Sequence, residues 1–157
     1  MKESIARLEY LCTLIPPIME REDEEQFSVK SSPGKWSKKE ILGHLIDSAT
    51  HNHHRFVRCR FEDAPNIFYD QDRWVTYSRY QSIPLKHLVH FWTAYNKHLV
   101  DLLKLLSPED LQRVCIMKDG SSVTLDFLVD DYVLHLEHHL RQLVRYEEPA
   151  NEEHLSN

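Results

Sequence analysis

Four long stretches of the chain repeat apolar side chains every three or four residues, and this periodicity constrains the fold more than any other feature of the sequence. A period near 3.6 is typical of amphipathic α-helices, whereas a half-buried β-strand alternates strictly. Helices of about 20 residues are about 30 Å long, the usual height of a helix bundle. The sequence therefore predicts an all-α fold, a four-helix bundle whose apolar core lies between the helices.

The first two helices carry clear boundary signals. The first has its apolar stripe between residues 5 and 15 and then reaches Pro16-Pro17, which should stop or kink it before a short acidic continuation to about residue 27. The second should begin at a capping box, in which the Ser37 hydroxyl accepts a hydrogen bond from the backbone and Glu40 reaches back to Ser37. The second helix is expected to end near residue 61.

The third and fourth helices follow a long connection. This connection, residues 63–81, has no sustained period but many aromatic residues, so it is expected to pack on the bundle. The third helix should begin after Ser82, with Pro84 in its first turn, and end near residue 106. A turn of helix at 109–111, an extended piece at 114–117 and a turn at Asp119-Gly120 then lead to Thr124, which should cap a fourth helix ending near residue 146. The pattern predicts one domain over residues 1–148 and a polar tail over 149–157.

Composition and charge argue against several classes of function. The three glycines, at positions 34, 43 and 120, are too scattered for a nucleotide-binding loop or a hydrolase elbow. The formal net charge is −6 and no basic block is present, so no nucleic-acid partner is expected. No apolar run approaches the roughly 20 residues that span a bilayer, and the three cysteines form no C-x-x-C motif. We therefore expect a reduced, cytoplasmic protein without a membrane contact.

Histidine is the anomaly of the composition, with 11 residues. His135 and His139 stand four apart on the fourth helix, so both imidazoles leave one face and can bind one cation. In a chain this rich in histidine such a pair also arises by chance, and then it marks only an exposed polar face. His44 and His135, however, occupy core-stripe positions where leucine would be expected, and buried neutral imidazoles need partners. One divalent ion, such as zinc, nickel, iron or copper, would satisfy all three histidines and leave a fourth position open for water or substrate.

Three charged residues are candidates to assist the ion. Asp47 lies one turn after His44, and Asp131 lies one turn before the histidine pair, so either could orient an imidazole or act as a general base. Arg55 could hold an anionic group of the substrate or pair with Asp70. Surface salt bridges are the alternative role for all three.

The other histidines are expected to lie outside the site. His51 stands seven residues from His44, about 10.5 Å along the helix axis, so it could at best support the ligands. Five more are expected to be exposed: His53, His54, His87, His90 and His98. His138 is expected to lie at the surface or at a contact with a partner. Tyr69 and Trp74 could line the pocket mouth or pack in the core. Gly43 costs up to about 1 kcal/mol within a helix, which would be explained by close approach of another helix.

Two separated motifs resemble the DinB-like superfamily, in particular its second DinB-like domain group. The motifs are Trp36-Ser37-x-x-Glu40-x-x-Gly43-His44-Leu45-x-Asp47, followed by Arg55-Phe56, and His135-x-x-His138-His139-Leu140-x-Gln142. Between them, Tyr69-Asp70-Gln71-Asp72-x-Trp74-Val75 is similar to the aromatic and acidic connection of the family. The resemblance covers nearly the whole chain, from the first helix to Tyr146.

The resemblance implies a four-helix bundle in which His44, His135 and His139 bind a divalent metal in an open site. Members of the family are often described as metal-dependent hydrolases, and relatives include transferases that use thiols such as bacillithiol, mycothiol or glutathione. We therefore expect a metal-dependent enzyme, either a hydrolase or a low-molecular-weight-thiol S-transferase, that acts on a small molecule. The alternative is a non-catalytic metal-binding or interaction protein, in which the ion stabilises the bundle and a helix face forms a homodimer.

Overall fold

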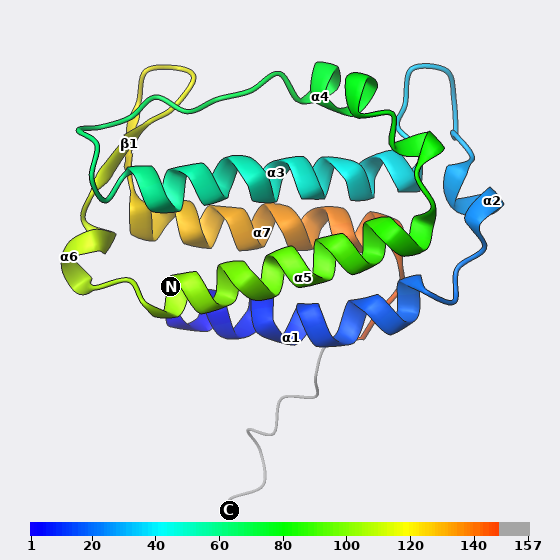
Figure 1. Cartoon of the computed structure of the whole chain (residues 1–157), viewed down its shortest axis with the longest axis horizontal. Helices are drawn as coiled ribbons and strands as arrows, with labels where there is room; N and C mark the ends of the chain where they lie inside the picture. The colour runs from blue at the N-terminus through cyan, green and yellow to red at the C-terminus, as the bar shows by residue number, and fades with distance from the viewer. Residues whose placement is uncertain (148–157) are drawn as a thin grey trace, which may run out of the picture.

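The computed structural model describes residues 1–147, and it places four long helices side by side (Figure 1). These helices are α1 (Lys2–Met19), α3 (Lys38–Arg58), α5 (Leu85–Lys104) and α7 (Leu125–Leu143). Both α1 and α3 pack against α5 and α7, so the four helices enclose one core. The expected all-α, four-helix bundle is confirmed. The predicted polar tail, residues 149–157, lies outside the described residues.

Short elements fill the connections between the long helices. They are α2 (Glu24–Ser28), α4 (Gln71–Ser78), the 3-10 turn η1 (Tyr80–Ser82), α6 (Pro108–Leu111), and the strands β1 (Val114–Ile116) and β2 (Ser122–Thr124). The strands form an antiparallel hairpin with Cys115 opposite Val123, and Gly120 has a φ of +84° at its turn. The long connection between α3 and α5 lies over α3 and carries α4 and η1, so it is partly helical (Figure 1).

Several helix ends differ from the sequence prediction. Helix α1 continues through Pro16 and Pro17 to Met19, because the prolines lie in its last turn, where the Pro16 carbonyl still accepts from the backbone N–H of Glu20. Helix α3 ends at Arg58 rather than near residue 61, and α7 ends at Leu143 rather than near residue 146 because the next residue is extended. Pro84 is the N-cap residue of α5 and does not lie inside its first turn.

The caps predicted for the two histidine-bearing helices are confirmed. The backbone N–H of Glu40 donates to Ser37 Oγ over 3.1 Å, and the backbone N–H of Ser37 donates to the Glu40 carboxylate over 2.8 Å. Thr124 Oγ1 accepts from the backbone N–H of Phe127 over 3.3 Å. These caps set where α3 and α7 begin, and therefore which of their residues face the core.

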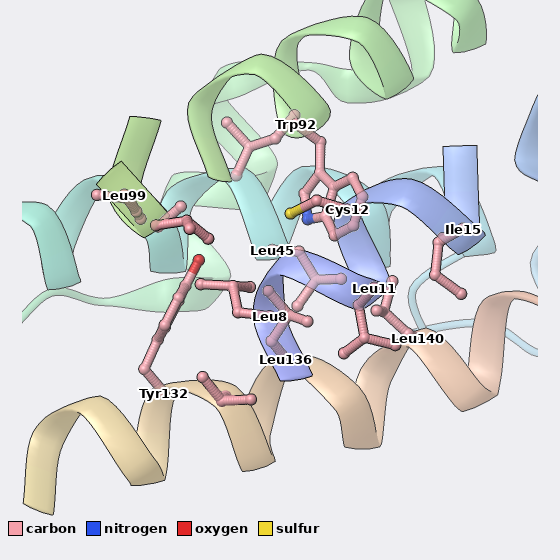
Figure 2. Packing of buried hydrophobic residues seen from close by; sticks show 14 of the residues in the cluster. Leu8, Leu11, Cys12, Ile15, Leu45, Trp92, Leu99, Tyr132, Leu136 and Leu140 are labelled. Atoms are coloured by element: carbon pink, nitrogen blue, oxygen red, sulfur yellow. The ribbon is translucent and has the colours of Figure 1, made fainter. Parts of the chain in front are cut away.

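All four long helices contribute to one apolar core (Figure 2). Side chains that are fully or almost fully buried there include Leu8, Leu11, Ile15, Leu45, Trp92, Leu99, Leu136 and Leu140. Within this core the Tyr132 hydroxyl donates to Asn96 Oδ1 over 2.5 Å, and Asn96 Nδ2 donates to the Trp92 carbonyl over 2.9 Å, so both buried polar side chains have partners. Each fully buried leucine contributes roughly 1.5 to 3 kcal/mol, so most of the folding energy comes from apolar burial.

Gly43 makes room for a side chain rather than for the neighbouring helix that was expected. A Cβ atom on Gly43 would lie 2.1 Å from Cδ2 of Tyr80, whose ring covers α3 at this point. The Tyr80 hydroxyl donates a hydrogen bond to Asp47 Oδ1, one turn further along α3. Because Gly43 has no side chain, the Tyr80 ring can pack on α3 and hold η1 against that helix.

We expect Gly43→Ala to destabilise the fold by about 1 to 3 kcal/mol, despite the better helix propensity of alanine, because the Tyr80 ring must move and release Asp47. Urea unfolding measures the change. In a Tyr80→Ala background the same substitution should be neutral or stabilising by up to about 1 kcal/mol. Equal destabilisation in both backgrounds would show that the ring is not the cause.

No helix within residues 1–147 is both long enough and apolar enough to cross a membrane.

Candidate metal centre

Three histidines from two helices converge at one point of the bundle. His44 on α3 meets His135 and His139 on α7, and one ring nitrogen from each lies within 4.8 Å of the others. Nε2 of His44 is 3.3 Å from Nε2 of His135. The convergence has a simple local cause, because the i, i+4 spacing places both α7 rings on one face and α3 packs against that face. The structure brings together all three predicted ligands.

All three imidazoles are held in the neutral form that binds metals. Burial, followed by the neighbouring histidines, lowers the pKa of His44 to about 3. Burial and the charges of His139 and His138 lower the pKa of His135 to about 4, and burial also lowers the pKa of His139. Near neutral pH each ring therefore offers a lone pair.

The three residues fit a divalent ion. Two Nε2 atoms at 3.3 Å cannot both be acceptors, so a proton or a cation has to lie between their lone pairs. A tetrahedral ion bound by imidazole nitrogens at about 2.0 to 2.1 Å holds those nitrogens about 3.3 Å apart. Nδ1 of His44 and Nδ1 of His139 are buried without a hydrogen-bond partner among the described residues. No cysteine or carboxylate within residues 1–147 joins the cluster, so a bound ion would keep a position for a further ligand.

The three charged residues that were predicted to assist the ion lie at different places in the fold. Asp47 is buried and its Oδ2 atom has no partner among the described residues, while Arg55 donates to the Ile67 carbonyl over 2.7 and 3.1 Å. Arg55 thus fastens the long connection to α3, and it does not pair with Asp70, which caps α4. Asp131 is exposed on α7. No hydrogen bond within residues 1–147 links Asp47, Arg55 or Asp131 to the three histidines, so their catalytic roles stay predictions.

The other histidines among residues 1–147 lie outside the cluster. His51 is buried, donates from Nδ1 to the Asp47 carbonyl over 2.8 Å, and stacks on Tyr69 with ring centres 3.7 Å apart. Trp74 meets the same ring edge-on, so Tyr69 and Trp74 pack around His51. The expectation for His53 is wrong, because its ring is half-buried with Nδ1 3.0 Å from the Tyr95 hydroxyl of α5. The others are exposed as expected: His54, His87, His90, His98 and His138.

A cleft of about 330 Å³ opens beside His139, and no sequence pattern predicted that its walls would meet. They include Lys35, Trp36, Gln71, Asp72 and Gln142, from the loop before α3, from α4 and from the end of α7. The Trp36 ring lies 5.0 Å from the His44 ring, so this side chain borders both the cleft and the histidine cluster. Trp36 directly precedes the capping box of α3, and Gln71, Asp72 and Gln142 lie in the motifs that resemble the DinB-like superfamily, whereas Lys35 had no signal in the sequence.

The contribution of the buried Asp47 carboxyl to folding stability should depend on pH. Burial raises the pKa of Asp47 to about 6, although the Tyr80 hydroxyl bond acts in the opposite direction. A carboxyl whose pKa is higher in the folded state than in the unfolded state favours folding when protonated, and this contribution is lost as the pH rises from about 4 through 6. Asp47→Asn should therefore stabilise the metal-free protein by about 1 to 2 kcal/mol at pH 7.5 and change little at pH 4.

Thermal melts of the metal-free protein at both pH values measure this effect. The exposed Asp101→Asn on α5 is the matched control and should change stability little at either pH. A destabilised Asp47→Asn variant at pH 7.5 would show that the buried carboxylate is stabilising as an anion.

The chain is similar to proteins named as metal-dependent hydrolases. It is 26% identical over 144 residues to "Putative metal-dependent hydrolase OB0782" of Oceanobacillus iheyensis, covering 91% of this chain and 83% of that protein. A Bacillus mycoides protein named in the same way is 23% identical over 130 residues, covering 82% of this chain and 75% of its own length.

Solved structures share the fold. YfiT from Bacillus subtilis, described as "a probable metal-dependent hydrolase with an unusual four-helix bundle topology", superposes with a TM-score of 0.82 at 22% identity, covering 90% of this chain and 82% of YfiT. A mycothiol-dependent maleylpyruvate isomerase superposes with a TM-score of 0.73 at 11% identity, covering 90% of this chain and 60% of the isomerase. The family model of the DinB superfamily matches residues 4–143. This match spans all four long helices and the three histidines, and the chain therefore belongs to the DinB superfamily.

Proposed function

We propose that this protein is a metal-dependent enzyme whose His44, His135 and His139 hold one divalent ion in an open site. The observation that carries the proposal is the convergence of three neutral, half-buried to buried imidazoles, with two nitrogens 3.3 Å apart. The names of the relatives support hydrolysis, and the fold shared with a mycothiol-dependent isomerase supports a thiol as cosubstrate. A bound ion of this kind supplies Lewis acidity and lowers the pKa of a coordinated water or thiol.

The residues of the chain position the three histidines and line the approach to them. Caps at Ser37 and Thr124 set the two ligand helices, and Trp36 packs on the His44 ring at the entrance from the cleft. Asp47 is the buried carboxylate on the ligand helix, and we propose it as a base or an orienting group for the site. A homodimer, a cytoplasmic location and the absence of a nucleic-acid partner remain predictions from the sequence.

The test compares metal-free protein with protein reconstituted with zinc, nickel or ferrous iron. Each form is assayed with carboxylic esters and amides, and with a thiol panel (glutathione, cysteine and bacillithiol) in the presence of an alkyl halide electrophile. We expect turnover with one of these two groups of substrates, only in the metal-loaded protein, and no turnover in the His135→Ala variant. Ester or amide cleavage identifies a hydrolase, and thioether formation identifies an S-transferase. Collapse of the helical circular dichroism signal on chelation, without turnover in any arm, would favour the structural role instead.

A further inference from the structure

The cleft beside His139 brings one of the three candidate metal ligands together with two opposite charges. Lys35 comes from the loop before α3 and Asp72 from the first turn of α4, and these two are the charged side chains among the described residues that line the cleft. Gln71 and Gln142 add amide groups, and Trp36 adds an apolar wall against the His44 ring. A volume of about 330 Å³ corresponds to a small-molecule ligand.

Neither charge is paired with another side chain among the described residues. Within residues 1–147, no ion pair or side-chain hydrogen bond involves the Lys35 amine or the Asp72 carboxylate, and both residues are exposed. Nearby charges on the same segments are paired: Lys30 binds Glu40 over 2.8 Å, and Arg73 lies 3.6 Å from Asp70. Lys35 and Asp72 therefore stand apart as a cation and an anion available to a ligand.

We propose that the cleft selects a small zwitterion, a ligand with a carboxylate for Lys35 and an ammonium group for Asp72, whose third group reaches the metal position next to His139. The proposal rests on the proposed function, because the third group is directed to the metal. It goes further by naming the ligand class and the two side chains that select it. An ammonium group would donate to the Asp72 carboxylate, and the Lys35 amine would donate to the carboxylate of the ligand.

Three thiols, in which two carbon atoms separate the sulfur from each charged group, distinguish the two contacts. L-Cysteine carries both charges, cysteamine lacks the carboxylate, and 3-mercaptopropionate lacks the ammonium group. Binding of each probe to zinc-loaded protein is measured by calorimetry, and the zinc content is determined again after each titration. We expect L-cysteine to bind about three- to ten-fold more tightly than either of the other thiols.

Two variants assign the charges. Lys35→Gln should weaken L-cysteine and 3-mercaptopropionate about three- to ten-fold and leave cysteamine unchanged, whereas Asp72→Asn should weaken L-cysteine and cysteamine and leave 3-mercaptopropionate unchanged. Both residues are exposed, so neither variant should impair folding. Lys118→Gln and Asp101→Asn, exposed residues that do not line the cleft, are the matched controls and should change no affinity.

The outcomes separate this inference from the proposed function. Wild-type protein that binds zinc but binds no thiol, or binds all three equally, overturns the zwitterion proposal and leaves the metal site intact. The zwitterion proposal is also overturned if the affinities of Lys35→Gln and Asp72→Asn match the controls, because any preference then comes from chelation by the ion alone. Failure of the wild-type protein to bind zinc through the three histidines contradicts the proposed function itself.

Discussion

Replacing His139 by alanine is expected to abolish tight metal binding and, with it, all metal-dependent turnover. One of the three nitrogens that lie within 4.8 Å of one another is removed, and two imidazoles hold a divalent ion poorly. Loss of a side chain that only hydrogen-bonds to a metal ligand lowers metal affinity about 10- to 100-fold. Loss of the ligand itself should therefore lower the affinity for the metal at least about 100-fold. Titration with zinc or nickel, and metal content after gel filtration, measure this loss.

The neighbouring histidine provides the matched control. His138 is exposed on the next position of α7, and His138→Ala should keep the affinity and the turnover of the wild type. His139→Ala should retain the helical circular dichroism signal, because the apolar side chains of four helices, not the ion, form the core. Full turnover in a variant that no longer binds metal would end the metal-enzyme proposal. A large fall in melting temperature without any activity to lose would support a structural ion.

The largest effect on stability is expected from Trp92→Ala, which should destabilise the protein by about 3 to 5 kcal/mol. Trp92 is fully buried in α5 and belongs to the same cluster as Cys12 of α1 and Leu45 of α3 (Figure 2). Its removal leaves a cavity in the middle of the bundle, and dense packing prevents the neighbours from filling it. Chemical denaturation of both proteins under identical conditions gives the difference in unfolding free energy.

Trp92→Phe separates packing from hydrogen bonding at the same position. The indole Nε1 atom of Trp92 has no hydrogen-bond partner among the described residues, so phenylalanine sacrifices volume but no bond. The loss should then be clearly smaller than for alanine. A Trp92→Phe variant as unstable as Trp92→Ala would show that the indole N–H has a partner, such as an internal water, that stabilises the core.

The local part of the fold could be predicted because its causes are local. The apolar period marks the long helices, and Ser37 and Thr124 mark where two of them begin. The i, i+4 spacing of His135 and His139 places two of the three candidate metal ligands on one helix face. The effect of Pro16-Pro17 on α1 was predicted less well, because a proline removes its own backbone N–H but the residues after it can still form helical hydrogen bonds. Helix α1 continues to Met19, about one turn beyond Pro16.

The contacts between residues far apart in the sequence were decided only by the tertiary structure. The chain's own pattern places His44 on a core stripe, but the packing of α3 against α7 brings its Nε2 to 3.3 Å from that of His135. The same holds for the fit of Tyr80 over Gly43 and for the meeting of Lys35 with Asp72 at one cleft. Periodicity states which face of a helix is buried, whereas the partner of that face depends on the packing of all helices together.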